Sequence, residues 1–369
     1  MVRGGYGVYY NTSVYQSIAQ QMSQQYPLSK SLSVANSPAN PLTLANGFNA
    51  APGVTPNTFA IDPNFLVGYS QNWQLSVQRD LFEGIVLTGT YLGIKGTRGM
   101  QLSLPNTYPT GVADPCPSCP AGYTYLSSNG NSTREAGQLQ VLRRFHNGFS
   151  ATVQYTYSKA IDDGVLGGKP NAAGVATQTW YTAQDWLNLA AERGLSGFDQ
   201  RHLLTVKTQY STGSGLRGGA LMKGWRGELF KGWTFLTDIT AGSGLPQTPI
   251  FFAPVSGTGV TGTLRPDYVG GSIYGGPPGY FLNAAAFAPA VGHFGTAGRD
   301  SITGPSQFVL NASMGRTFRE VIDLRVDSTN ALNHVAFTSW NTVIGSQQFG
   351  LPAQAGAMRN LQVTVRWRF

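Results

Sequence analysis

Apolar and polar side chains alternate along much of this 369-residue chain at the two-residue period of a β-strand. Residues 149–158, FSATVQYTYS, alternate without interruption, and so do the last nine residues, LQVTVRWRF. The same pattern predicts ten strands, at about residues 2–10, 70–81, 85–95, 137–145, 149–158, 201–210, 232–242, 308–318, 321–330 and 361–369. We therefore predict an all-β, antiparallel fold whose strands are apolar on one face only.

The connections between these strands alternate in length. Short connections containing FEG and HNG, and another around residues 319–320, predict tight hairpins, because Gly and Asn-Gly supply the positive φ that such turns need. The long connections are 11–69, 97–135, 159–200, 243–306 and 331–359, and one of medium length spans 211–231. Long irregular connections are unusual in a compact soluble domain, whereas short inner turns and long outer loops are typical of outer-membrane barrels. The odd-numbered strands would then run outward and the last strand would end at the periplasm.

Composition supports a transmembrane barrel and excludes other classes. Charged residues make up 11% of the chain, against about 25% in ordinary soluble domains, while 47 residues are glycine. No apolar run approaches the ~18 residues of a membrane-spanning helix, so a helical membrane protein is excluded. The net charge is +8, but the basic residues are dispersed, and we expect no nucleic-acid partner.

Aromatic residues on the apolar faces fall near the strand ends. Trp73 and Tyr157 lie at the predicted outer ends, and the predicted inner ends carry Phe149, Tyr210, Trp233, Trp367 and Phe369. Two aromatic belts at the two membrane interfaces are typical of barrels. The alternative is a secreted soluble all-β binding protein, such as an adhesin or lectin-like sandwich, in which these rings would be buried in the middle of a core.

Six sequence stretches occur in a familiar order. They are VRGGYGVYYN (2–11), RGLSGFDQRHLLTV (193–206), GSGLPQTP (242–249), FLNAAAFAP with FGTAGRDSITGP (281–305), DSTNALNH (327–334) and the terminal VTVRWRF. The chain thus resembles the barrel of TonB-dependent outer-membrane receptors, specifically the Oar-like group with an N-terminal carboxypeptidase-regulatory-like domain. The resemblance implies a 22-stranded barrel with a plug, uptake energised by the inner-membrane TonB complex, and a C-terminal aromatic, Phe369, read by the barrel-assembly machinery.

The resemblance also leads to an expectation about domains and function. Residues 1–369 are expected to be the C-terminal part of the barrel, without signal peptide, plug or N-terminal domain. The expected role is that of a receptor segment for uptake of a siderophore, glycan or similar substrate in the outer membrane of a Gram-negative-type bacterium.

The polar strand faces supply candidate lumen residues. Seven side chains are predicted to face the substrate or the plug: Gln154, Lys207, Asp323, Arg325, Asp327, Arg366 and Arg368. The ninth and tenth strands should be antiparallel neighbours, so that opposite charges meet between them. The alternative role for these charges is a structural ladder that keeps the strands in register.

The remaining motifs give little support to catalysis or metal binding. Cys116 and Cys119 form one CxxC among prolines, which favours a loop disulfide over a zinc or redox site. GTGVTG at 257–262 lacks the strand and helix of a dinucleotide-binding site. A hydrolase built on His202 with Ser196 or Ser211 has no support in the residue spacing. We predict no enzyme activity, no cofactor and no metal.

Aromatic residues in the long loops have two possible roles. They are Trp180, Tyr181, Trp186, Tyr274, Tyr280 and Phe281. Such rings either stack on a sugar or siderophore or pack the loop itself.

Overall fold

The ten strands form one continuous antiparallel sheet in chain order. The computed structural model describes residues 1–12, 14–25, 28–29, 41, 43–45, 59–82, 84–105, 108–113, 117, 124–164, 182–185, 187–213, 224–251, 264–318 and 321–368. The sheet order is β1 (Val2–Tyr10), β3 (Tyr69–Asp80), β4 (Ile85–Ser103), β5 (Thr124–His146), β6 (Phe149–Asp162), β9 (His202–Ser211), β10 (Trp233–Gly242), β16 (Gln307–Phe318), β17 (Ile322–Thr329) and β21 (Asn360–Trp367). All ten predicted strands are confirmed.

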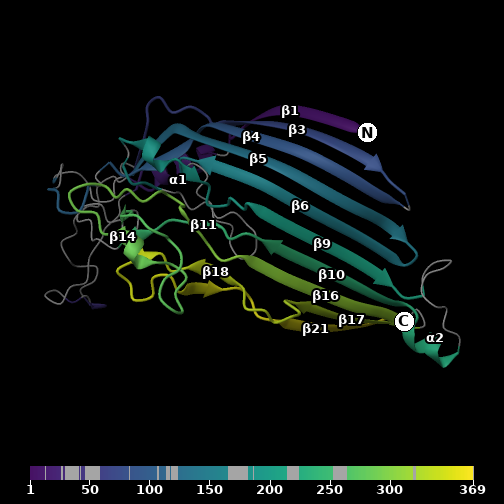
Figure 1. Ribbon diagram of the computed structural model, residues 1–369. Helices are drawn as coiled ribbons and strands as arrows, with labels where there is room; N and C mark the ends of the chain where they lie inside the picture. The colour runs from purple at the N-terminus through teal and green to yellow at the C-terminus, as the bar shows by residue number, and fades with distance from the viewer. Residues whose placement is uncertain are drawn as a thin grey trace.

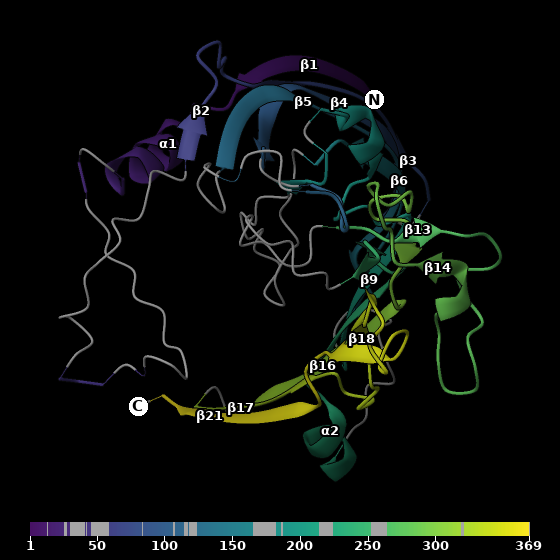
Figure 2. The ribbon, with the colours of Figure 1, turned by 90° about the vertical axis from the view of Figure 1, so that its left-hand side faces the viewer.

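The sheet is a curved wall with two different ends. The long connections lie together at one end, and the short turns lie at the other, where the chain also starts and finishes (Figure 1). Figure 2 shows the wall as an arc seen from the loop end. Among the described strands β1 pairs only with β3 and β21 only with β17, so the arc is open along both edges.

The predicted hairpin turns have the expected backbone geometry. Between β5 and β6, Asn147 and Gly148 have φ values of 53° and 78°, the left-handed conformation that favours these two residue types. At the opposite end, β4 and β5 extend past the predicted boundaries at residues 95 and 137, and they pair as far as Ser103 and Tyr125. These extensions are rich in glycine and polar residues and are interrupted by register shifts, so they lack the alternation on which the prediction depended.

Short helices and strands lie at the loop end, and one further helix lies at the turn end. The helical ones are α1 (Val14–Ser23), the short helices Leu189–Glu192 and Ala284–Ala286, and α2 (Trp225–Phe230) at the turn end. The short strands are β2 (Phe59–Ile61), β7 (Thr182–Ala183), β8 (Gly194–Leu195), β11 (Pro246–Gln247), β12 (Ile250–Phe251), β13 (Asp267–Tyr268), β14 (Phe287–Ala288), β15 (Ile302–Thr303), β18 (Phe337–Trp340), β19 (Val343–Ile344) and β20 (Pro352–Ala355). No helix within the described ranges has the length and apolar character needed to cross a membrane.

Strand register separates the two faces of the wall. One row across neighbouring strands is wholly apolar: Leu87, Val141, Val153, Val206, Ile239 and Leu310. The next row points to the other face and is polar: Gln78, Thr88, Gln140, Gln154, Thr205 and Thr240. Since side chains alternate along each strand, the wall has one apolar and one polar face.

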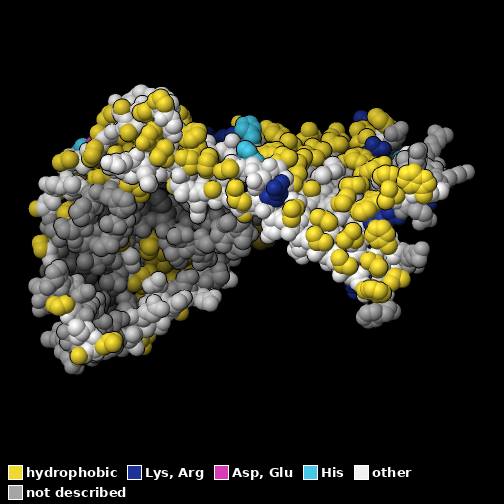
Figure 3. Space-filling model, turned by 90° about the horizontal axis from the view of Figure 1, so that it is seen from below, with side chains coloured by type: hydrophobic (Ala, Val, Ile, Leu, Met, Phe, Trp, Pro, Cys, Tyr) yellow, Lys and Arg dark blue, Asp and Glu magenta, His cyan; other side chains and the backbone are white. Residues whose placement is uncertain are grey.

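The buried hydrophobic core lies in the loops rather than against the wall. Its main cluster consists of Leu282, Ala286, Phe287, Ala297, Ile302, Trp340 and Phe349. On the apolar face of the wall, by contrast, Tyr157 is 51% exposed and Trp367 is 66% exposed. Figure 3 shows hydrophobic side chains spread over the wall on the side away from the loops, with few charged groups. No second sheet among the described residues covers this face, so the soluble-sandwich alternative is wrong about where these rings lie.

Candidate functional site

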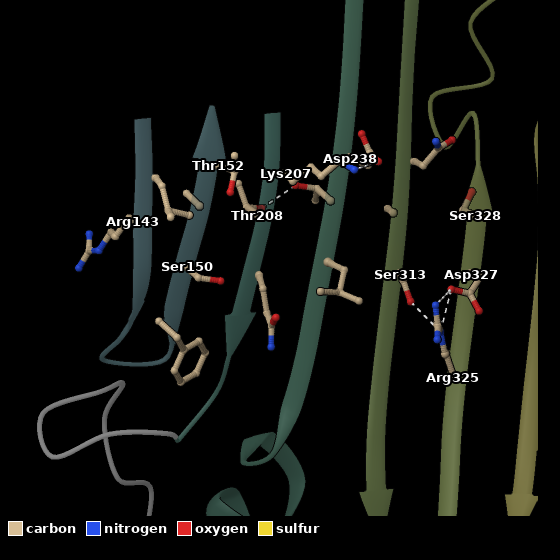
Figure 4. Close-up of a pocket in the computed structure, with 18 of the residues that line it drawn as sticks. Arg143, Ser150, Thr152, Lys207, Thr208, Asp238, Ser313, Arg325, Asp327 and Ser328 are labelled. Atoms are coloured by element: carbon tan, nitrogen blue, oxygen red, sulfur yellow. Dashed lines mark hydrogen bonds and ion pairs between the residues drawn. The ribbon is translucent and has the colours of Figure 1, made fainter. Parts of the chain in front are cut away.

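A shallow hollow of about 590 Å³ lies on the polar, concave face of the wall near the turn end. It crosses six neighbouring strands, β5, β6, β9, β10, β16 and β17, because polar side chains at matching register positions line up across them. Its charged lining residues are Arg143, Arg144, Lys207, Asp238, Arg325 and Asp327, and Ser150, Thr152 and Ser313 add hydroxyl groups (Figure 4). The hollow therefore combines charged groups and hydroxyls with apolar side chains such as Leu236 and Ala312.

Four of these charged residues form two ion pairs within the hollow. Lys207 and Asp238 stand opposite each other on β9 and β10, with their Nζ and Oδ2 atoms 3.7 Å apart. Arg325 bridges to Asp327 at 2.8 Å and also donates to the Ser313 hydroxyl at 3.2 Å. Lys207 and Arg325 remain more than half exposed, so both groups can also reach a ligand or another segment.

The structure divides the seven predicted lumen residues into two groups. Lys207, Arg325 and Asp327 line the hollow together. Gln154 lies on the same face at a neighbouring row, opposite Gln140 and Thr205. Asp238, which completes the pair with Lys207, was not among the predicted residues, although it stands on the polar face of the strand at 233–242.

The other group lies at the end of the wall formed by β17 and β21. Asp323 is directly opposite Arg366, and its carboxylate accepts hydrogen bonds from Arg368 at 2.7 Å and from the Thr317 hydroxyl at 2.7 Å. The opposite charges of the ninth and tenth strands do meet. Their contact with a substrate or plug stays a prediction.

Aromatic residues gather at the turn end of the apolar face. Phe149 and Tyr210 are register partners, and Trp233 packs edge-on against Phe318 with ring centroids 6.1 Å apart. The Arg316 guanidinium lies over both rings of that second pair and donates to the Leu229 carbonyl of α2. Trp367 follows on the last strand, opposite Ile322.

Trp73 and Tyr157 lie farther toward the loop end. The Trp73 ring covers Gly93 on the next strand so closely that a Cβ atom there would meet it at 2.2 Å. Tyr157 stands opposite His202. Phe369, both cysteines, residues 257–262, Trp180, Tyr181 and Trp186 lie outside the described residues.

Buried ion pairs join the loops above the wall. The Arg265 guanidinium binds the Glu192 carboxylate at 2.7 Å, and both side chains are almost fully buried. Arg299 likewise binds Asp162 at the end of β6 and Asp300 beside it in the chain. These residues were not among the predicted site residues. Glu192 immediately precedes the stretch at 193–206 and Arg299 lies within the one at 281–305, so these regions hold the loop framework together.

One carboxyl group at this end is poorly solvated. Burial raises the pKa of the Asp163 carboxyl, although hydrogen bonds from the Asn131 backbone N–H at 2.9 Å lower it in part. The Gln101 side chain donates to the Asp163 carbonyl at 2.7 Å. The end of β6 is thus tied to both β4 and β5.

The residues of the hypothetical hydrolase do not converge. Ser196 is fully buried in the loops, and Ser211 lies at the opposite end of β9 from His202. The His202 ring is hydrogen-bonded to the Tyr155 hydroxyl at 2.7 Å instead. These three residues therefore form no nucleophile and base pair.

Comparisons with known proteins agree with this geometry. The sequence profile of a family described as outer membrane beta barrel domain matches residues 1–362. Among solved structures, the outer membrane transporter YddB from Escherichia coli is similar over all of this chain and 38% of its own, with 10% identity and a TM-score of 0.51. At this identity the similarity supports the fold alone.

Two other solved structures are similar over all of this chain. One is P. aeruginosa FpvA bound to heterologous pyoverdines, with 11% identity, 31% of that chain covered and a TM-score of 0.46. The other is the ferric-catecholate import receptor Fiu from E. coli K12, with 11% identity, 33% covered and a TM-score of 0.44. The chain thus spans about a third of the length of these proteins. The comparison with curated proteins found no significant match.

Proposed function

Because the chain belongs to the outer membrane beta barrel domain family, we propose that it forms part of the wall of a TonB-dependent receptor. The receptor takes up a substrate of undetermined identity through the outer membrane. Support comes from the six ordered sequence stretches that resemble this receptor group and from the continuous ten-stranded wall.

The single observation that carries the proposal is the separation of the two faces. No second sheet among the described residues covers the apolar row from Leu87 to Leu310. Contact with the hydrocarbon of a membrane would remove these side chains from water in place of such a sheet. The backbone groups between these strands are paired within the sheet, as a membrane requires. The polar face is then left for a water-filled lumen.

Within this proposal the hollow faces the lumen. Lys207, Arg325 and Asp327 contact substrate or plug there, while Gln154, Asp323, Arg366 and Arg368 extend the polar wall around them. The ion pairs between different strands support the competing structural role equally well, because a charge ladder also keeps strands in register. The experiment below separates the two roles.

The remaining partners follow from the same assignment. The outward-facing interface of the outer membrane is contacted by Trp73 and Tyr157. Its periplasmic interface is contacted by Phe149, Tyr210, Trp233 and Trp367. Phe369 is proposed as the residue that the barrel-assembly machinery reads. The TonB complex would engage parts of the receptor N-terminal to the wall.

The proposal is tested by uptake into cells that express the full-length protein. Accumulation of ferric siderophores and of neutral oligosaccharides is measured with and without functional TonB, and the protein is located by membrane fractionation. We expect the protein in the outer membrane and an uptake that disappears without TonB. Equal uptake in both strains would refute TonB dependence, and protein in the aqueous fraction would refute the membrane wall.

Charge exchange in the hollow then decides between contact and ladder. Lys207→Asp and Asp238→Lys each break the pair, and the double variant restores it with reversed direction. If the pair only keeps register, the double variant regains uptake. If Lys207 contacts the substrate, uptake by the double variant stays low although the amount of protein in the outer membrane equals that of wild type. Lys159→Ala, on the apolar-side row and outside the hollow, serves as the control.

A further inference from the structure

A second concavity, of about 570 Å³, lies at the loop end, and its described lining residues are all different from those of the hollow. It is formed by the segment between β13 and β14, the segment leading from β15 into β16, and the end of β18. Its lining residues are Tyr274, Gly275, Tyr280, Phe281, Thr303, Gly304, Pro305, Ser306 and Trp340. We call this set the loop groove.

The aromatic rings of the loop groove are exposed. Tyr274, Tyr280 and Phe281 keep 44%, 36% and 47% of their surface accessible, whereas Trp340 beneath them is only 9% exposed. Packing of the loop explains Trp340. Large parts of the other three rings still face water, and a ligand that covered this apolar surface would gain binding free energy.

The same rings are held in place. Phe281 stacks on Trp340 with centroids 4.1 Å apart and planes 20° from parallel. The Tyr274 hydroxyl accepts a hydrogen bond from the Thr303 N–H at 2.7 Å, and the Tyr280 hydroxyl donates to the Gln347 carbonyl at 3.3 Å. Since the rings are already ordered, a ligand that stacks on them loses little binding energy to side-chain immobilisation.

The polar groups of the groove define the ligand further. The side chains of Thr303 and Ser306 are exposed, and neither hydroxyl has a hydrogen-bond partner among the described residues. None of the lining residues that the structure describes carries a charge. An anionic ligand or charged metal chelate would leave its charge without the charged hydrogen bonds that usually recognise such groups.

From these contacts we propose that the loop groove binds a neutral sugar ring of a glycan. A pyranose has one face of C–H groups, which packs flat on an aromatic ring, and an edge of hydroxyl groups, which pairs with hydroxyls such as those of Thr303 and Ser306. A purely apolar ligand would bury both hydroxyls without partners, at a cost in free energy. Rigid rings beside free hydroxyls and no charge fit a neutral saccharide best.

Binding is tested on the purified full-length protein in detergent with neutral oligosaccharides of glucose, galactose and mannose, and with polygalacturonate as the charged comparison. Saturation-transfer NMR detects contact, and titration calorimetry gives the affinity. We expect at least one neutral oligosaccharide to bind and polygalacturonate not to compete. If no neutral oligosaccharide binds at millimolar concentration, the proposal is wrong.

Two variants test whether the sugar binds in the loop groove. Tyr280→Ala removes an exposed ring and should weaken binding roughly tenfold, while Ser306→Ala removes one exposed hydroxyl without touching the loop packing and should weaken it by a factor of about 3 to 10. Tyr268→Ala, an exposed loop tyrosine outside the groove, is the matched control. Unchanged affinity in both groove variants would overturn the site. Because this assay needs neither TonB nor uptake, it succeeds or fails independently of the transport proposal.

Discussion

Val206→Arg tests whether hydrocarbon contacts the apolar face of the wall. Val206 stands between Val153 and Ile239 in the apolar row, four residues along β9 from Tyr210 at the turn end. At ~3.3 Å per residue and a strand tilt of ~40°, four residues correspond to a depth of roughly 10 Å within an apolar band about 25 Å tall. Position 206 therefore lies close to the membrane midplane.

An arginine on the lipid face at the midplane costs about 2 to 4 kcal/mol, or roughly 30- to 800-fold in the folding equilibrium. Thr205→Arg, the neighbouring residue on β9, places the same side chain on the polar face and should cost far less. The free energy of unfolding is measured by urea titration of the full-length protein in lipid vesicles. Equal losses in the two variants would refute the assignment of the faces, and a larger loss for Thr205→Arg would reverse it.

Three further changes test the loop end and the outer aromatic contact. Glu192→Ala leaves the buried Arg265 guanidinium without its carboxylate and should destabilise the loops by about 3 to 5 kcal/mol, seen as faster hydrogen exchange there; exchange unchanged from wild type would count against the pair. Asp163 has a raised pKa in the folded state, so the folded protein holds the proton more tightly and stability falls as pH rises through that raised pKa. At pH 7 the amides of the loop end should therefore be better protected against hydrogen exchange in Asp163→Asn than in wild type, and the two degrees of protection should converge near pH 3. A difference in protection that widens toward acid would contradict this sign. Gly93→Ala should displace the Trp73 ring and shift its fluorescence, a change that must vanish when Trp73 is already replaced by phenylalanine.

The strands of the wall could be predicted because their causes are local. Alternation along a segment such as 149–158 assigns each side chain to a face, and Asn147-Gly148 provides a hairpin turn through its own backbone preferences. The charged contact between the last two strands followed from the same logic, since Asp323 and Arg366 occupy polar-face positions on adjacent strands. Asp238 occupies such a position too, but only the register of β9 and β10 identifies it as the partner of Lys207.

The loop end could not be predicted in this way. Arg265 and Glu192 are 73 residues apart, and Arg299 and Asp162 are 137 apart, so no periodicity along the chain connects them. The loop aromatics carried two possible roles in the sequence, and the structure shows one of them, packing of the loop, at Phe281, while stacking on a ligand stays a proposal. Phe281 packs on Trp340 while keeping nearly half of its surface exposed.

The amino-acid sequence by itself determined the number of strands in the wall, the face that each of their side chains occupies and the sites of the tight turns, because neighbouring residues set all three. The tertiary structure decided the curvature of the wall, the extension of β4 and β5 beyond their alternating segments, the ion pairs in the loops and the loop groove. Each of these depends on residues that are distant in the chain, and their side chains meet only after the strands have paired.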